Sequence, residues 1–251
     1  MTLEIDLTGE RAFVTGANTG IGASIAIALA RAGAHVVAVG RSAMDETLGA
    51  IEAIGGTGEA LRADLGDRVA ALAAFEEASG REPIGVLVNN AGLIRRADAV
   101  DFTEADWDAV MDVNLKTVFF LSQAFARKVL AEKRGGKIIN IASMLSFQGG
   151  VRVASYTASK SGVAGLTRLL ACEWAEQGIN VNAIAPGYIA TNNTEALRSD
   201  KTRNAAILGR IPAGRWGLAD DIGAMAAFLA SPLAAYVHGA IIPVDGGWLA
   251  R

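Results

Sequence analysis

A chain of 251 residues is long enough to bury a substantial hydrophobic core, so its folding does not depend on disulfides or structural metal ions. Its composition, 51% hydrophobic and 20% charged residues, is typical of a compact globular protein and excludes intrinsic disorder. The net charge of −3 leaves no basic surplus to neutralise a phosphate backbone, so nucleic acid is not expected as a partner.

Targeting signals, membrane spans and metal sites are not indicated by the sequence. The stretch Met1 to Arg11 carries acidic residues and lacks the basic and apolar regions of a signal peptide, and no run of about 18 uncharged apolar residues occurs. We therefore expect a cytoplasmic protein without a membrane partner. The single cysteine, Cys172, lies in an apolar-periodic stretch and is expected to fill the core. His35 and His238 are the only histidines, which is too few for a transition-metal site, and both are expected to be structural or exposed.

Short runs rich in Val and Ile alternate with longer segments of helical period. Several of the runs are apolar at consecutive positions, as strands buried on both faces require. Strand and helix in alternation predict a single α/β domain over residues 1–251, a Rossmann-type doubly wound parallel sheet with helices on both faces. The expected strands are Arg11–Thr15, His35–Val39, Ile84–Asn89, Lys137–Ala142, Asn180–Ala185 and Ala240–Val244, and the clearest helices are Ile21–Ala32, Ala105–Leu130 and Ser155–Glu176.

A glycine-rich turn follows the first expected strand and opens the first expected helix, with the sequence TGANTGIG over residues 15–22. Glycine permits a positive φ and lets the backbone approach a pyrophosphate closely, while the helix N-terminus faces the phosphate charge. In this context the turn predicts a dinucleotide site.

The residues after the second expected strand do not decide whether the cofactor carries a 2′-hydroxyl, as in NAD, or a 2′-phosphate, as in NADP. The sequence there is Val39-Gly40-Arg41-Ser42, with no carboxylate to bind the ribose hydroxyls of NAD. Arg41 can pair with the 2′-phosphate of NADP, but it can equally be exposed or stack on the adenine, and Asn18 and Thr19 add no second basic group. The cofactor is therefore NAD or NADP.

Tyr156 and Lys160 lie four residues apart, on one face of an expected helix and one turn from each other. A nearby ammonium favours the phenolate form of a tyrosine, so Tyr156 is expected to be the general base in alcohol oxidation and the general acid in ketone reduction. Ser143, directly after the expected strand Lys137–Ala142, is expected to hydrogen-bond the substrate oxygen.

These motifs, taken together, resemble the short-chain dehydrogenase/reductase family. The glycine turn is T-G-x-x-x-G-x-G, and it is followed in order by Asn89-Asn90-Ala91-Gly92, Asn114, Ser143, Tyr156-x-x-x-Lys160 and Pro186-Gly187. The resemblance implies that Asn114 anchors a water-linked proton relay to Lys160, that Lys160 holds the nicotinamide ribose, that a segment near residues 187–212 forms a lid, and that the protein is a homotetramer. The implied cofactor-binding residues are Gly16, Asn18, Thr19, Gly20, Ile21, Gly22, Arg41, Asp64, Leu65, Asn90, Ala91, Gly92, Tyr156, Lys160, Pro186, Gly187, Ile189 and Thr191.

The loop between Ser143 and Tyr156 is expected to border the reacting carbon. In it, Arg152 can bind a carboxylate bidentately, or instead hold the loop through a salt bridge or a subunit contact, and Gln148 can bind a hydroxyl. Further candidates nearby are Arg95, Arg96, Asn192 and Asn193. The expected substrate-binding set is Ser143, Gln148, Arg152, Tyr156, Arg95 and Asn192.

Five stretches, 89–96, 141–160, 185–193, 210–218 and 245–251, are similar to a group within that family, the 2-dehydro-3-deoxy-D-gluconate 5-dehydrogenases of bacterial uronate and pectin breakdown. This resemblance implies interconversion of a secondary alcohol and a ketone on a six-carbon sugar acid. Two alternatives stay open: a reductase of another substrate, such as a 3-oxoacyl thioester, and a dinucleotide-binding regulator without catalysis. A regulator of that kind is expected to lack Tyr156 or Lys160, and this chain has both.

Overall fold

Seven parallel strands form one sheet in the computed structural model, which describes residues 4–251; residues 1–3, part of the N-terminal stretch considered above, lie outside the described residues. The strand order is β3-β2-β1-β4-β5-β6-β7, so the direction of winding reverses between β1 and β4. In such sheets ligands bind beyond the carboxyl ends of the strands, at the point of reversal. The strands are β1 (Arg11–Thr15), β2 (His35–Gly40), β3 (Thr57–Arg62), β4 (Val86–Asn89), β5 (Gly136–Ile141), β6 (Ile179–Pro186) and β7 (Ile241–Val244).

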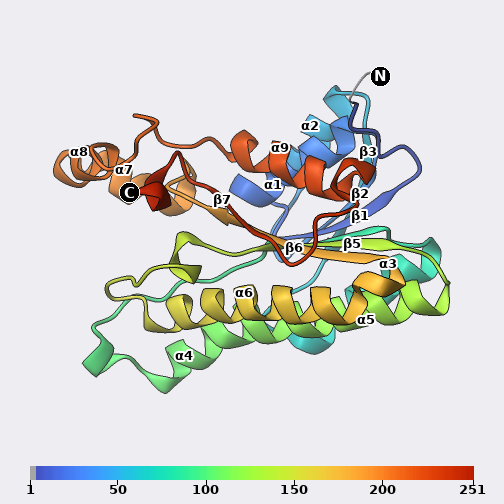
Figure 1. Ribbon diagram of the computed structural model, residues 1–251, viewed down its shortest axis with the longest axis horizontal. Coiled ribbons are helices and arrows are strands. Elements are labelled where there is room, and N and C mark those ends of the chain that lie inside the picture. The colour runs from blue at the N-terminus through green and yellow to red at the C-terminus, as the bar shows by residue number, and fades with distance from the viewer. Residues whose placement is uncertain (1–3) are drawn as a thin grey trace.

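Helices cover both faces of the sheet: α1, α2 and α9 lie on one face, and α3, α4, α5 and α6 on the other (Figure 1). Neighbouring residues of β1 serve both layers, because Val14 belongs to the core beneath α1 and α9 while Phe13 belongs to the core beneath α3 and α5. Alternate side chains of a strand point to opposite faces, which explains the uninterrupted apolar runs. The helices are α1 (Gly20–Arg31), α2 (Asp45–Ala53), α3 (Arg68–Arg81), α4 (Glu104–Met111), α5 (Thr117–Ala131), α6 (Ala154–Trp174), α7 (Glu195–Ser199), α8 (Lys201–Leu208) and α9 (Ala219–Ala230).

The predicted fold class is confirmed, and the six expected strands agree with the structure to within two residues at either end. Strand β3 had no apolar signal because it is an edge strand and four of its six residues are exposed. The single helix expected over Ala105–Leu130 is wrong in detail, since a π-helical turn over Asp112–Lys116 separates α4 from α5.

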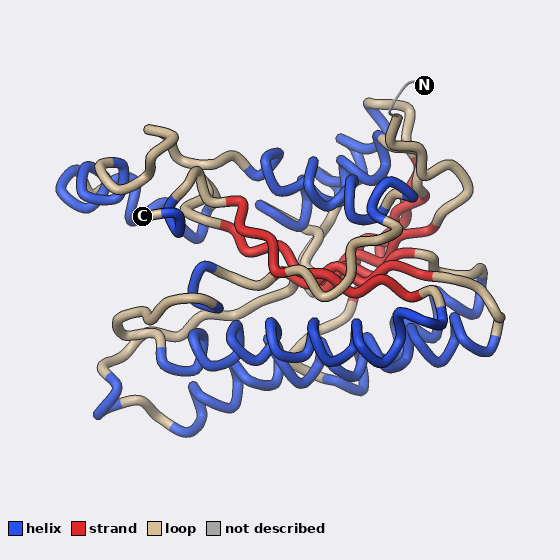
Figure 2. Tube along the Cα trace, viewed as in Figure 1, coloured by secondary structure: helices blue, strands red, loops and turns tan. Residues whose placement is uncertain are grey.

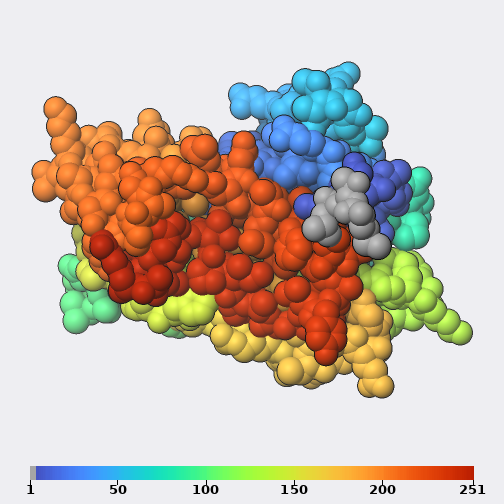
Figure 3. All heavy atoms as spheres, turned by 45° about the horizontal axis from the view of Figure 1, so that its top comes forward, coloured from blue at the N-terminus to red at the C-terminus, as the bar shows by residue number. Residues whose placement is uncertain are grey.

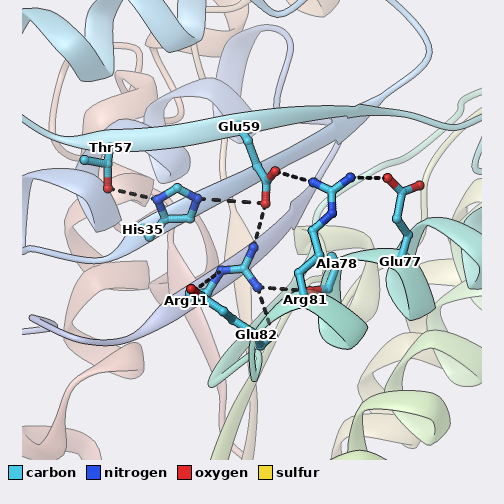
Figure 4. Close-up of polar contacts among 8 residues, drawn as sticks. All are labelled: Arg11, His35, Thr57, Glu59, Glu77, Ala78, Arg81 and Glu82. Carbon is cyan, nitrogen blue, oxygen red and sulfur yellow. Dashed lines mark hydrogen bonds and ion pairs between the residues drawn. The ribbon is translucent and has the colours of Figure 1, made fainter.

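The two ends of the sheet differ in character. Long loops, together with α7 and α8, gather where strands β6 and β7 end (Figure 2). At the opposite, amino-terminal end, Arg11 and Arg81 both bind Glu59, each with a guanidinium nitrogen 2.6 Å from a carboxylate oxygen (Figure 4). Arg11 also donates to the carbonyl oxygens of Ala78 and Glu82, at 3.0 and 2.8 Å. These contacts fasten β1, β3 and α3 to one another far from the loops.

Candidate active site

The glycine turn is held in place by the carboxyl end of β4. The Asn90 side-chain amide donates to the carbonyl oxygens of Thr15 and Gly16, at 2.9 and 3.1 Å. The Thr15 hydroxyl accepts from the backbone N–H groups of Asn90 and Ala91, both at 3.0 Å. Asn90 therefore fixes the shape of the turn in addition to lying beside it.

The turn requires glycine at three positions, for its backbone conformation at Gly16 and Gly20 and for lack of space at Gly16 and Gly22. Gly16 and Gly20 have φ angles of +65° and +57°, and a Cβ atom at Gly22 would lie 2.1 Å from the Gly16 carbonyl oxygen. Helix α1 starts directly after it, and Thr19, its N-cap, makes no side-chain hydrogen bond to the first turn. The first N–H groups of α1 thus remain available for an anionic ligand, and the tight glycine backbone allows that ligand to approach. These residues fit the pyrophosphate of a dinucleotide.

The expected adenine side of the site is lined by the ends of β2 and β3. Arg41 is exposed directly after β2, and Asn18 of the glycine turn lies over Gly40, with its side-chain oxygen 3.4 Å from the position of a Cβ there. Asp64 is exposed after β3 and accepts from the backbone of Gly66 at 2.9 Å, whereas Leu65 is buried. The structure therefore places Arg41 and Asp64 at the same end of the sheet as the glycine turn.

Tyr156 and Lys160 lie in the first two turns of α6, next to the end of β5 that carries Ser143. Ser143 is near enough to Tyr156 to lower its pKa, and the Lys160 ammonium lies 5.7 Å from the centre of the tyrosine ring. Lys160 is buried and donates to the Ile141 carbonyl oxygen of β5. The structure thus brings Ser143, Tyr156 and Lys160 together, in the arrangement that proton transfer to or from a substrate oxygen requires.

The environment of this pair acts on both protonation equilibria. Burial raises the pKa of Tyr156 above its usual 10, while the hydrogen bond from Ser143 and the charge of Arg96 act in the opposite direction. Burial also lowers the pKa of Lys160 from 10.5 to about 8. In the protein without ligands, therefore, the tyrosine is a phenol at neutral pH and the lysine is still mostly charged.

Asn114 sits in the π-helical turn that interrupts the long helix, and it is fully buried. Its side-chain oxygen accepts from Leu93 N–H at 2.8 Å, and its amide donates to the Leu93 carbonyl at 2.9 Å and to the Ser159 hydroxyl at 3.2 Å. The Ser159 hydroxyl in turn donates to the Tyr156 carbonyl oxygen at 2.9 Å. A π-turn adds a residue to the helix and often marks a functional site. Here it directs Asn114 at the segment after β4 and at the start of α6.

The expected substrate-binding residues differ in whether their side chains already have partners within the protein. Arg152 has a φ of +64° and forms an ion pair with Asp98 at 3.0 Å, which is the loop-holding alternative that the sequence left open. Arg95 is paired with Asp106, also at 3.0 Å. Gln148 accepts a hydrogen bond from the Trp248 indole, and Asn192 is exposed at the start of the lid segment. Neither Arg95 nor Arg152 is therefore free of a carboxylate partner.

Two side chains contribute to this region beyond the expected set. Arg96 is near enough to Tyr156 to lower its pKa, and no ion pair involving Arg96 occurs within residues 4–251. The doubled arginine was visible in the sequence, but only the fold distinguishes Arg95, turned to Asp106, from Arg96. Trp248 is buried against Met144 and Ile211 although it is remote in sequence from Met144, and no local pattern indicates this contact.

The segment after β6, where a lid is expected, reaches the cofactor side of the site. Pro186 ends β6 and Gly187 follows it, and the Thr191 methyl lies 3.4 Å from the position of a Cβ at Gly20 of the glycine turn. Ile189 is buried and bridges to Gly217 in a short parallel pairing. The segment after β6 thus lies against the turn between β1 and α1 at Gly20.

The expectation for Cys172 is wrong, because the thiol is exposed on α6. Apolar periodicity indicated a buried face but not which neighbouring positions belong to it, and Leu169 on the same side of the helix is also 48% exposed.

His35 and His238 are hydrogen-bonded to Thr57 and Asn180. Within residues 4–251 no cluster of acidic, histidine or cysteine side chains has the arrangement of a metal site. Of the helices in that range, none combines the length and apolarity that crossing a bilayer needs.

The chain is similar to known dehydrogenases in both sequence and structure. A family model described as enoyl-(acyl carrier protein) reductase matches residues 16–249. The 2-dehydro-3-deoxy-D-gluconate 5-dehydrogenases of Escherichia coli and Dickeya dadantii are 56% and 55% identical, over 98% of this chain and 97% and 98% of theirs. A protein of Agrobacterium tumefaciens, crystallised with bound NADP, superimposes with a TM-score of 0.96 at 62% identity over the whole of both chains. The chain therefore belongs to the short-chain dehydrogenase/reductase family.

Proposed function

We propose that this chain is an NAD(P)-dependent oxidoreductase that interconverts a secondary alcohol and a ketone on a six-carbon deoxy sugar acid, of the 2-dehydro-3-deoxy-D-gluconate or 2-deoxy-D-gluconate type, in uronate and pectin breakdown. The observation that carries the chemistry is the grouping of Ser143, Tyr156 and Lys160 at the end of β5. The full-length similarity to the two sugar-acid dehydrogenases supports the substrate class over a 3-oxoacyl thioester.

The cofactor, when bound, accepts or donates the hydride. The turn from Gly16 to Gly22 and the N-terminus of α1 would hold its pyrophosphate, Arg41 and Asp64 would face its adenosine half, and Asn90, Lys160 and Ile189 its nicotinamide half. Because Arg41 takes the place of an acidic residue, the site accepts a 2′-phosphate without charge repulsion. NADP bound to the similar Agrobacterium protein is consistent with that.

The proton chemistry belongs to the chain's own side chains. In oxidation, the phenolate form of Tyr156 takes the proton of the substrate hydroxyl, and in reduction its phenol returns a proton to the carbonyl oxygen. Ser143 donates to the same substrate oxygen and stabilises the charge that develops there. The Lys160 ammonium stabilises the phenolate, and Asn114 fixes the backbone around Leu93 and, through Ser159, the first turn of α6.

The substrate carboxylate needs a cation that is not already neutralised. Arg96 meets this requirement, since Arg95 and Arg152 are ion-paired with Asp106 and Asp98. We propose Arg96 as the charged anchor of the carboxylate, with Gln148 and Asn192 also contacting the substrate and residues 187–212 closing over it as a lid.

The decisive experiment is steady-state oxidation of 2-deoxygluconate and reduction of a 2,5-diketo-3-deoxy sugar acid, with NAD(H) and NADP(H) compared. Turnover of a 3-oxoacyl thioester but of neither sugar acid would overturn the substrate class. Tyr156→Phe is expected to lower kcat by several orders of magnitude while the circular dichroism spectrum stays unchanged. An active Tyr156→Phe variant would refute the assignment of the proton donor.

We also propose that the protein is a homotetramer. Leu169 on α6 supports this, because this aliphatic side chain is 48% exposed and would gain from burial in a subunit contact. Light scattering at micromolar concentration tests it, and a monomeric mass would exclude it.

A further inference from the structure

The C-terminal segment from Asp245 to Arg251 lies against the lid. The Gly246 carbonyl accepts from Ala213 N–H at 3.0 Å, and the Arg251 guanidinium donates to the Gly209 carbonyl at 2.8 Å. Two consecutive glycines with φ angles of +66° and +87° turn the chain into this position after β7. Figure 3 shows the same packing, with the red C-terminal segment against the orange lid residues. The segment is therefore part of the wall around the candidate substrate site.

Trp248 is the residue of this segment that reaches furthest inward. It is only 4% exposed and packs with Met144, which directly follows Ser143, and with Ile211. The Tyr188 ring lies 4.8 Å from it, and the Arg210 guanidinium lies over its face at 3.9 Å. A buried aromatic ring so enclosed has little freedom to move, so it is a rigid support for the loop that begins at Met144.

The indole also makes one directional contact. Trp248 Nε1 donates to the side-chain oxygen of Gln148 at 3.3 Å. An indole N–H is a donor only, so the amide oxygen, and not the NH₂ group, has to face Trp248. The Gln148 NH₂ group has no hydrogen-bond partner among residues 4–251. Because the amide oxygen faces Trp248, the NH₂ group of Gln148 points away from the indole and is free to donate to another group.

We propose that Trp248 is a positioning residue that turns Gln148 into a hydrogen-bond donor to the substrate carboxylate. A carboxylate only accepts hydrogen bonds, and the NH₂ end of an amide only donates, so the two are complementary when the amide cannot turn over. The inference rests on the proposed sugar-acid function, and it adds a source of acid specificity that is separate from the charge of Arg96.

A double-mutant cycle with Trp248→Phe and Gln148→Ala tests the proposal. Phenylalanine keeps an aromatic ring in the pocket but removes the donor. Trp248→Phe is expected to raise KM for the sugar acid about three- to tenfold with little change in kcat, as the loss of one hydrogen bond predicts. In the Gln148→Ala background the same substitution is expected to change KM less than about twofold, because the group that it orients is already gone. Equal effects in both backgrounds, or a fall in kcat with KM unchanged, would overturn the proposal.

The Gln148→Glu variant tests whether the side chain at position 148 has to donate a hydrogen bond to the substrate. The glutamate can still accept from Trp248, but it presents a negative oxygen where the amide presented NH₂, so KM for the acid is expected to rise more than with Gln148→Ala. A KM closer to the wild-type value would overturn the proposal. Trp216→Phe is the matched control, because that indole also contacts Tyr188 but donates to Asn204 of α8 at 2.7 Å and not to the substrate loop.

The cycle stays informative if the proposed function fails. Should the wild-type protein not turn over the sugar acid, that function is refuted, and the cycle is run with the secondary alcohol that the wild type does oxidise. Coupling between Trp248 and Gln148 then still decides whether the indole orients the amide, since its absence would refute the positioning role for any substrate.

Discussion

Replacing Lys160 by methionine is expected to abolish activity and yet stabilise the fold. Burial lowers the pKa of Lys160 from 10.5 to about 8, so near neutral pH the folded protein carries an ammonium that the unfolded chain holds more favourably. At about 1.4 kcal/mol per pKa unit, the buried charge costs about 3 kcal/mol. Methionine removes this cost but leaves the Ile141 carbonyl without its donor, a loss of about 1 kcal/mol. The net gain in unfolding free energy is therefore about 2 kcal/mol.

The pH dependence of that gain distinguishes the removal of a buried charge from a change in packing. Because the folded-state pKa of Lys160 lies below the unfolded-state value, its destabilising effect is complete below about pH 8 and disappears as the pH rises toward 10.5. Near pH 9.5 the cost has fallen to about 1 kcal/mol, so wild type and Lys160→Met are expected to unfold at nearly the same denaturant concentration.

Urea unfolding of both proteins at equal concentration, without cofactor, at about pH 7 and 9.5, measures this difference. Lys116→Met is the control, since Lys116 is exposed and paired with Asp112, and its replacement is expected to have little effect at either pH. A gain for Lys160→Met that is the same at both pH values would refute the reasoning, because it would come from packing and not from charge.

Three further predictions concern other parts of the chain. Gly22→Ala is expected to weaken NADPH binding at least about tenfold in a fluorescence titration, because its Cβ would lie 2.1 Å from the Gly16 carbonyl oxygen; unchanged affinity would contradict the proposed cradle. Arg41→Ala is expected to raise KM for NADP(H) several-fold more than KM for NAD(H), and equal increases would exclude a contact with the 2′-phosphate. Glu59→Gln is expected to cost about 1–3 kcal/mol in urea unfolding while KM for substrate and cofactor stays unchanged, because it leaves the buried Arg11 guanidinium without its closest carboxylate; an altered KM would contradict the separation of this network from the site.

The expected elements included the central strands of this fold but not the edge strand β3, nor helices α3 and α9, although the inner faces of both helices are buried. The central strands have side chains in two cores, so their apolar runs are unmistakable, as in β1 around Phe13. The edge strand β3 presents Thr57 and Arg62 to solvent and pairs with one neighbour only, and nothing in its composition requires a strand.

For the candidate site, motifs located the cofactor turn and the tyrosine–lysine pair, but they did not specify which polar groups are already paired. From the sequence alone, Arg95, Arg96 and Arg152 are equivalent candidates for binding the substrate carboxylate. Only the fold shows that Asp106 and Asp98 neutralise two of them. In the same way, Trp248 and Gln148 are 100 residues apart, and a contact of that kind depends on how β7 and the loop after β5 converge.

The Arg11–Glu59–Arg81 network at the amino end of the sheet has a consequence for how this chain can change. Its contacts join β1, β3 and α3, whereas every group assigned to chemistry lies beyond the opposite ends of the strands. Most substitutions that create a new activity cost stability, and a fold tolerates them only while it remains above its stability threshold. Improving the ion pairs at this end would raise the tolerance for such substitutions without touching the reacting groups. A library aimed at new sugar acids should therefore start from a variant stabilised at the amino end.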